Sequence, residues 1–199
     1  MKIIVIGAAG DIGTAICAEL GARHDLIRVG RTSGDIHADI ADRTSIRAMY
    51  AITGTVDAVV SATGTVHFGP LADFTEDQLM LGLAHKVMGQ INIVLEGFIH
   101  VADGGSFTLT SGVLDRDPIR MGVGAATANG ALGGFVAGAA IEMPRSQRIN
   151  VVSPGLLQAS VGRYGNWFPG HEPVSSDRVG RAYAKSVEGA ITGKVIIVS

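Results

Sequence analysis

Three glycines near the start of the chain have the spacing of a loop that binds phosphate groups. The stretch GAAGDIG follows an apolar run at 2–6 and precedes a helical pattern. In such a turn the first glycine permits the tight bend, the second lets the backbone approach a pyrophosphate, and the third lets the helix pack closely on the sheet. The pattern predicts a dinucleotide site, with a purely structural glycine turn as the alternative. The residues expected at this site are Gly7, Ala9, Gly10, Asp11, Ile12 and Gly13.

The end of the second apolar run indicates which nucleotide binds. An acidic residue at this place would bond the ribose 2′-hydroxyl of NAD. The stretch VGRTSGD has Arg31 there instead, followed by Thr32 and Ser33. A guanidinium flanked by hydroxyls suits a 2′-phosphate. The sequence therefore favours NADP(H) over NAD(H), and a solvated loop cation is the alternative for Arg31.

Short apolar runs alternate with longer helical patterns along the chain. Strands are expected at 2–6, 26–30, 57–62, 105–110, 148–153 and 194–199, with a short extra strand near 36–38. Helices are expected near 11–22, 43–53, 75–98, 121–143 and 176–188. The strand runs are rich in Val and Ile and mostly do not alternate, which is typical of strands covered on both faces. The order predicts the α/β class, with a single Rossmann-type, doubly wound parallel sheet in one domain spanning 1–199.

The composition excludes several other classes of function. The chain of 199 residues is 47% hydrophobic and 17% charged, which argues against disorder. A net charge of −2 gives no electrostatic basis for binding nucleic acid or an anionic membrane. The single cysteine, Cys17, permits no internal disulfide and favours a reducing, cytoplasmic setting. The six histidines show no metal-ligand spacing, so no metal is assigned.

The chain resembles the short-chain dehydrogenase/reductase family along nearly its whole length. HADIAD carries an Asp where the family places one near the adenine, and SATG (61–64) replaces the usual NNAG. RINVVSPG (148–155) matches the segment whose Pro-Gly lies near the nicotinamide. The cofactor-binding residues that this resemblance adds are Asp39, Ala62, Gly64, Pro154 and Gly155. It also implies about seven strands in the order 3-2-1-4-5-6-7, helices on both faces, and a homodimer or homotetramer.

The chain departs from the family at the motif that transfers protons. Family members carry Tyr-x-x-x-Lys on the helix expected here at 121–143. The aligned positions are Ala125 and Asn129, in a stretch rich in glycine and alanine. None of the three tyrosines has a lysine four residues later. Loss of such a general acid typically costs about 10²–10⁴ in rate, so another donor is needed for efficient turnover.

Two polar residues remain as candidates for catalysis. TLTSG (108–112) matches the strand that ends in the family's catalytic Ser, which implies Ser111, or Thr110 if the register slips by one residue. HKVMG places Lys86 where the family has an Asn of its proton relay. Burial would lower the pKa of Lys86 toward neutrality and suit it to proton transfer. A lysine that extends to solvent from a helix face is the alternative.

Two functions from different classes follow. The first is an NADP(H)-dependent oxidoreductase that acts on a small carbonyl or alcohol with a non-standard proton donor. The second is a non-catalytic NADP(H)-binding sensor or scaffold, because the Tyr and Lys of the family are missing. Tyr164 lies where the family places its substrate loop, but for Tyr164 and Trp167 a packed loop or an oligomer contact is favoured over catalysis. His67 is expected to be a surface residue of its loop.

Overall fold

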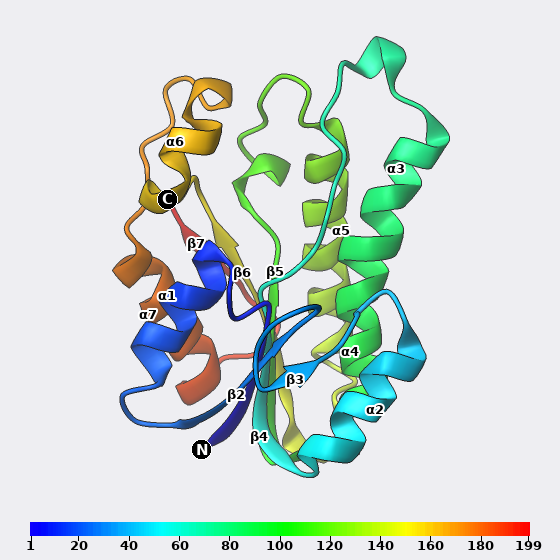
Figure 1. Ribbon diagram of the computed structural model, residues 1–199, viewed down its shortest axis with the longest axis vertical. Helices are drawn as coiled ribbons and strands as arrows, with labels where there is room; N and C mark the ends of the chain where they lie inside the picture. The colour runs from blue at the N-terminus through cyan, green and yellow to red at the C-terminus, as the bar shows by residue number, and fades with distance from the viewer.

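A parallel sheet with helices on both faces organises residues 1–199, all of which the computed structural model describes (Figure 1). The strands are β1 (Lys2–Ile6), β2 (Asp25–Gly30), β3 (Ile36–His37), β4 (Val56–Ser61), β5 (Val101–Thr110), β6 (Arg148–Pro154) and β7 (Val195–Val198). They lie in the order β3-β2-β1-β4-β5-β6-β7, and each neighbouring pair is parallel. The predicted α/β class and strand order are confirmed.

The helices alternate with the strands along the chain. They are α1 (Asp11–Leu20), α2 (Arg43–Thr53), α3 (Glu76–Gly82), α4 (Gly89–Gly97), α5 (Val123–Ala139), α6 (Val161–Tyr164) and α7 (Ser176–Glu188). A π-helical segment, Leu83–Met88, joins α3 directly to α4, so the helix expected at 75–98 has wider turns in its middle. None of the helices combines the length and the apolar character needed to cross a bilayer.

Alternate residues of each central strand supply two separate cores. Ile3 and Val5 pack in a core with residues of α1 and α7. Ile4 and Ile6 face the other side and pack in a core with residues of α2, α4 and α5. Successive side chains of a strand point to opposite faces, so a strand covered on both sides must be apolar throughout. Figure 1 shows α1 and α7 on one side of the sheet and α2, α4 and α5 on the other.

Among the element boundaries that differ from the expected ones, two have a clear local backbone reason. Strand β5 begins at Val101, four residues before the expected start, because Val101 pairs with Val56 ahead of a register shift. Polar residues and glycines follow Val101, so the run of apolar residues in the sequence does not mark where this strand begins. Helix α5 begins at Val123 and not at 121, because Met121 has a φ of 63°, outside the helical region.

The carboxyl ends of β1, β4, β5 and β6 lie at one edge of the sheet, where their loops gather. Helix α1 starts from this edge and approaches the first loop very closely. A Cβ atom at Gly13 would lie 2.0 Å from the carbonyl oxygen of Gly7 and 2.7 Å from Cα of Ala8. Gly7 itself has a φ of 83°, which favours glycine. Two glycines therefore bring the start of α1 to the edge of the sheet.

We expect Gly13→Ala to lower the free energy of unfolding by about 3 kcal/mol or more, because the added methyl group overlaps backbone atoms that cannot move aside. Gly130→Ala is the matched control, since nothing lies within 4 Å of a Cβ at this exposed position of α5. It should raise the free energy of unfolding by about 0.5–1 kcal/mol through helix propensity. Chemical denaturation of both variants measures this, and equal effects would contradict the packing role of Gly13.

Candidate active site

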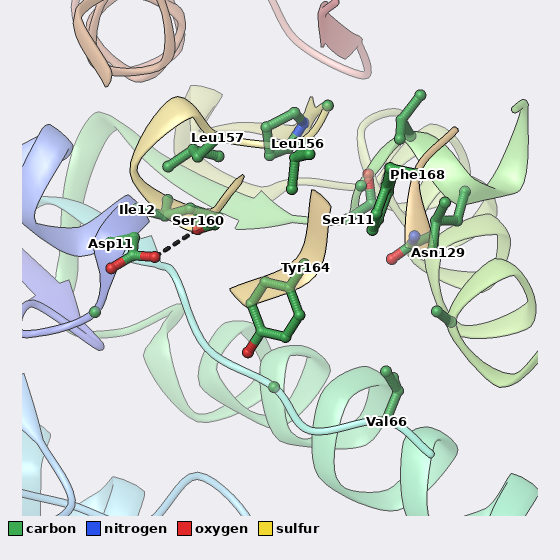
Figure 2. A pocket seen from close by; sticks show the side chains of 18 of the residues that line it. Asp11, Ile12, Val66, Ser111, Asn129, Leu156, Leu157, Ser160, Tyr164 and Phe168 are labelled. Atoms are coloured by element: carbon green, nitrogen blue, oxygen red, sulfur yellow. Dashed lines mark hydrogen bonds between the residues drawn. The ribbon is translucent and has the colours of Figure 1, made fainter. Parts of the chain in front are cut away.

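Two adjoining cavities open at the carboxyl edge of the sheet. The larger has a volume of about 560 Å³ and is lined by the loops after β1, β4, β5 and β6 (Figure 2). The smaller has a volume of about 200 Å³ and lies beside the ends of β1 and β2. Gly64 borders both cavities. Parallel sheets of this kind bind ligands outside the carboxyl ends of the strands, where the strand order reverses, and that point is between β1 and β4 here.

Most of the site residues expected from the sequence line one of these cavities. Those at the larger cavity are Ala9, Gly10, Asp11, Ile12, Ala62, Gly64, Lys86, Ser111, Pro154 and Gly155. Those at the smaller cavity are Gly7, Arg31, Asp39 and Gly64. Gly13, Thr32 and Ser33 line neither: Gly13 lies behind the turn, and the other two are exposed in the bend after β2. A ligand role for Thr32 and Ser33 stays a prediction.

The first loop fits a diphosphate. A Cβ at Gly10 would meet no atom closer than 3.5 Å, so the space above Gly10 is open, in contrast to the closed surroundings of Gly7 and Gly13. The bond from the N–H of Thr14 to the carbonyl of Gly10, at 2.8 Å, is the first of the α1 ladder. The N–H groups of the first turn precede it and have no helical partner. An open cradle and a helix N-terminus together suit an anionic ligand.

The smaller cavity has the features of a nucleoside site. Arg31 is exposed at its rim and brings a positive charge. Asp39 is anchored, because its Oδ1 accepts a 3.0 Å hydrogen bond from the N–H of Ala41. His85 also lines this cavity, while its neighbour Lys86 lines the larger one. The helix surface thus presents these consecutive side chains to different cavities, and His85 was not among the site residues expected from the sequence.

The ammonium group of Lys86 links its own π-helical segment to α5 and to the end of β5 at the larger cavity. Its Nζ donates to Oδ1 of Asn129 on α5 at 2.7 Å and to the carbonyl of Ser111 at 3.0 Å. Burial lowers the pKa of Lys86 to about 8, and the charge of Asp115 opposes this shift. An ammonium group has three donors, so one remains beyond these two bonds. Lys86 is thus held in place with a pKa close to neutral.

Asn129 is the partner of Lys86, which the sequence did not reveal. In the family that the chain resembles, the earlier helix carries the Asn and the later helix carries the Lys. Here the residue types are exchanged, and the two side chains are in direct contact. Ala125, at the position of the family's Tyr, is buried and lines the same cavity without a hydroxyl group. The protein therefore retains a Lys–Asn pair at this wall but not the phenol.

The structure distinguishes between the alternatives Ser111 and Thr110. Oγ1 of Thr110 donates to the carbonyl of Ser61 at 2.5 Å and lies 2.6 Å from the hydroxyl of Tyr183. Thr110 is thereby occupied within the core. Ser111 lines the cavity, with its N–H bonded to the carbonyl of Val152 at 2.9 Å. Ser111 and not Thr110 therefore faces the cavity, and a catalytic role for Ser111 stays a prediction.

Of the three tyrosines, only Tyr164 lines the larger cavity. Tyr50 and Tyr183 are completely buried, and burial raises the pKa of both. Tyr164 projects from α6 into the cavity (Figure 2). Trp167 follows it in the lining and meets Phe68 edge-on, with ring centroids 5.6 Å apart. The segment after β6 therefore lines the cavity, and the contact of Trp167 with Phe68 also fits the packed loop that the sequence favoured over catalysis.

Charged and apolar groups occupy different parts of the larger cavity. The charged residues in its lining are Asp11, Lys86 and Arg163. The apolar and aromatic residues away from the glycine loop include Val66, Phe68, Val113, Leu114, Ala125, Leu156, Leu157, Tyr164, Trp167 and Phe168. His67 lines neither cavity and packs edge-on against Phe74 at 5.5 Å. No three side chains among His, Cys, Asp and Glu gather in a way that could hold a metal ion.

The sequence of the chain is similar to known families of reductases and dehydrogenases. A family model described as enoyl-(acyl carrier protein) reductase matches residues 10–178. Versicolorin reductase 1 of Dothistroma septosporum is 27% identical over 210 aligned positions, which cover 88% of this chain and 77% of that protein. A short chain dehydrogenase of Passalora fulva is 29% identical over 57% of this chain, and the chain spans about half of that relative, 51% of its length.

Solved structures share the whole architecture. The protein lin1944 from Listeria innocua is 46% identical and superposes with a TM-score of 0.98. The alignment covers 100% of this chain and 100% of that one. A small-chain dehydrogenase solved in complex with NADPH is 24% identical and superposes with a TM-score of 0.87, over 100% of this chain and 96% of that one. At that identity the second likeness concerns the fold alone.

The surroundings of Lys86 predict its titration. We expect its side chain to titrate near pH 8, below the ordinary value of 10.5, because burial disfavours the ammonium form. Isotope-edited NMR of the lysine side chains measures this, and a Lys86→Arg variant identifies the signal among Lys2, Lys86, Lys185 and Lys194.

Asn129→Leu should lower the pKa of Lys86 further, because the ammonium loses an acceptor 2.7 Å away. Thr127→Val is the matched control, since Thr127 is an exposed residue of the same helix that bonds only the carbonyl of Val123. Identical titration of Lys86 in the two variants would contradict the role assigned to Asn129.

Proposed function

Because the chain belongs to the short-chain dehydrogenase/reductase family, we propose that it is an NADP(H)-dependent oxidoreductase that reduces a neutral carbonyl compound, with Lys86 as proton donor. The observation that carries this proposal is the ammonium group of Lys86, fixed at the cavity by Asn129 and Ser111. It places an acid with a pKa of about 8 at a site that lacks the family's tyrosine. An efficient general acid has a pKa near the working pH.

The two cavities suit the two halves of the cofactor. Arg31 at the smaller cavity is the group that would bind the 2′-phosphate, since a guanidinium matches phosphate geometry. Gly10 and the start of α1 would hold the pyrophosphate, and Pro154 and Gly155 border the larger cavity, where the nicotinamide would lie. The NADPH in the solved structure of the small-chain dehydrogenase supports NADP(H) as the cofactor by analogy of fold. When bound, the cofactor supplies the hydride.

The lining of the larger cavity supports a neutral, largely apolar substrate. Away from the glycine loop and Lys86, the lining consists mainly of aliphatic and aromatic side chains. A charged substrate group placed there would lose its hydration without gaining a partner. Aromatic rings such as Phe68 and Trp167 favour flat apolar groups by stacking and edge contacts. We infer that the substrate is a ketone or aldehyde attached to an apolar, preferably aromatic, body.

The proton step follows from the bonds that Lys86 makes. Two of its three donors are directed to Asn129 and to the carbonyl of Ser111, and the third is available for the substrate oxygen. As the carbonyl carbon is reduced, its oxygen gains negative charge and takes a proton from Lys86. Lys86 is left as a neutral amine and regains a proton from solvent. The hydroxyl of Ser111 lines the same cavity and can orient the oxygen by a hydrogen bond.

A non-catalytic NADP(H)-binding protein is the second candidate. Ala125 favours it, because this residue leaves the cavity wall without the tyrosine that the family uses. The two candidates share the cofactor and differ in turnover. Tight NADPH binding without reduction of any carbonyl compound in a broad aromatic and aliphatic panel would support the sensor or scaffold function over the enzyme.

We expect low micromolar binding of NADPH and much weaker binding of NADH. Arg31→Ala should weaken NADPH binding about 10- to 100-fold, the effect of losing charge-assisted hydrogen bonds to one phosphate, and should leave NADH binding unchanged. Nicotinamide fluorescence titration measures both cofactors. Equal losses for NADPH and NADH would show that Arg31 does not read the 2′-phosphate, and no binding of either cofactor would overturn the proposed function.

Carbonyl reduction should slow as the pH rises through about 8, because the ammonium form of Lys86 donates the proton and is lost above its pKa. Lys86→Met should reduce kcat by about 10²–10⁴. Lys86→Arg keeps a positive charge but cannot release its proton near neutral pH, so it should stay slow and lose the pH step. If Lys86→Met and Ser111→Ala both retained the full rate of reduction, this mechanism would be wrong.

A further inference from the structure

A negative charge lies at the site proposed for the pyrophosphate. Asp11 is the first residue of α1 and lines the larger cavity beside Gly10. Its position at the helix N-terminus is favourable for the helix. The same carboxylate would repel the phosphates of a bound dinucleotide, which seek the same N–H groups. Something must therefore compensate its charge if the loop is to hold a cofactor.

The compensation comes from a segment far along the chain. Oδ2 of Asp11 accepts a 2.5 Å hydrogen bond from the hydroxyl of Ser160, shown as a dashed line in Figure 2. The same oxygen accepts a hydrogen bond from Nη2 of Arg163. The bond from Ser160, followed by the bond and charge of Arg163, holds the pKa of Asp11 below its usual value. Asp11 is thus ionised and paired at neutral pH.

Arg163 retains the capacity to bind a second anion. Its side chain is 59% exposed, and a guanidinium offers five N–H donors, of which one is used in the bond to Asp11. Arg163, Asp11 and Ser160 all line the larger cavity together with Gly10. The guanidinium therefore lies at the open cradle of the glycine loop. It can keep its bond to Asp11 and donate to a phosphate oxygen at the same time.

We propose that Arg163 is a cofactor-binding residue whose guanidinium bridges the carboxylate of Asp11 and the cofactor pyrophosphate. It neutralises the acidic residue of the glycine loop and adds a phosphate contact from the α6 segment. Cofactor binding and placement of this wall over the loop are then coupled through one side chain. The inference rests on the proposed function, since it requires that the larger cavity hold the pyrophosphate of NADP(H).

Binding measurements on the purified protein test this inference. Trp167 is the single tryptophan and lines the cavity, so energy transfer from it to NADPH reports binding at this site. Adenosine 2′-monophosphate, which has the 2′-phosphate but no pyrophosphate, serves as the second probe, measured by calorimetry. Arg181→Ala is the matched control, because Arg181 forms a 2.6 Å pair with Asp177 on the exposed face of α7.

We expect Arg163→Ala to weaken NADPH binding about 10-fold or more, while adenosine 2′-monophosphate binding and the Arg181→Ala control stay at the wild-type level. Arg163→Lys should recover part of the loss, because it keeps the charge but not the fork of donors. Asp11→Asn should tighten NADPH binding about threefold, since it removes a like charge beside the phosphates and leaves Arg163 free to bind them.

Two outcomes would overturn the inference. Unchanged NADPH affinity in Arg163→Ala would remove Arg163 from the cofactor site. Equal weakening by Asp11→Asn and Arg163→Ala would show that the ion pair acts only by placing the α6 segment, because both variants break that pair. If the wild-type protein itself did not bind NADPH, the proposed function would fail, and this result is distinguishable from the other two.

Discussion

The contact between the backbone at Gly13 and the carbonyl of Gly7 is the constraint on which the site depends. A Cβ atom at Gly13 would lie only 2.0 Å from that oxygen, so the close approach of helix α1 to the first loop requires glycine at this position. The N–H groups of its first turn therefore face the point where the strand order reverses, and an anionic ligand there meets a helix dipole. The two cavities on either side of this loop meet at Gly64, whose φ of 135° and close approach to Lys86 again require glycine.

Helix α5 explains how a wall of small residues can serve a chemical site. At Gly124 a Cβ atom would lie 2.8 Å from the carbonyl of His67, so this glycine permits the loop after β4 to pass close to the helix. At Gly130 and Gly138 nothing lies within 4 Å, so these glycines give no close contact within the chain. The buried polar contribution of α5 is Asn129, and its Oδ1 accepts the hydrogen bond of Lys86. The helix is therefore mainly architectural, and it acts on the site by holding a lysine that another helix supplies.

Charge is distributed unevenly around the larger cavity: its charged and its apolar side chains lie in different parts of the lining. Asp11 and Arg163 neutralise each other beside the glycine loop, whereas Phe68 and Trp167 contact each other in the apolar part of the cavity lining. Lys86 lines the same cavity, in contact with α5 and the end of β5. Burial lowers the pKa of Lys86, while its two hydrogen-bond acceptors hold the ammonium group in position. This combination suits proton transfer better than a permanent ion pair would, because an ion pair would stabilise the charged form.

The sequence by itself determined the features that depend on neighbouring residues. The runs of Val and Ile specified a parallel sheet covered on both faces, and the glycine spacing located the first loop, because backbone freedom and side-chain period are local properties. The tertiary structure decided the rest. It directed Ser111 and not Thr110 into the cavity, paired Lys86 with Asn129 across 43 residues, and paired Asp11 with Arg163 across 152 residues. Such contacts, and the lowered pKa of Lys86, depend on which distant segments pack over a group and exclude water from it, and no local pattern encodes that packing.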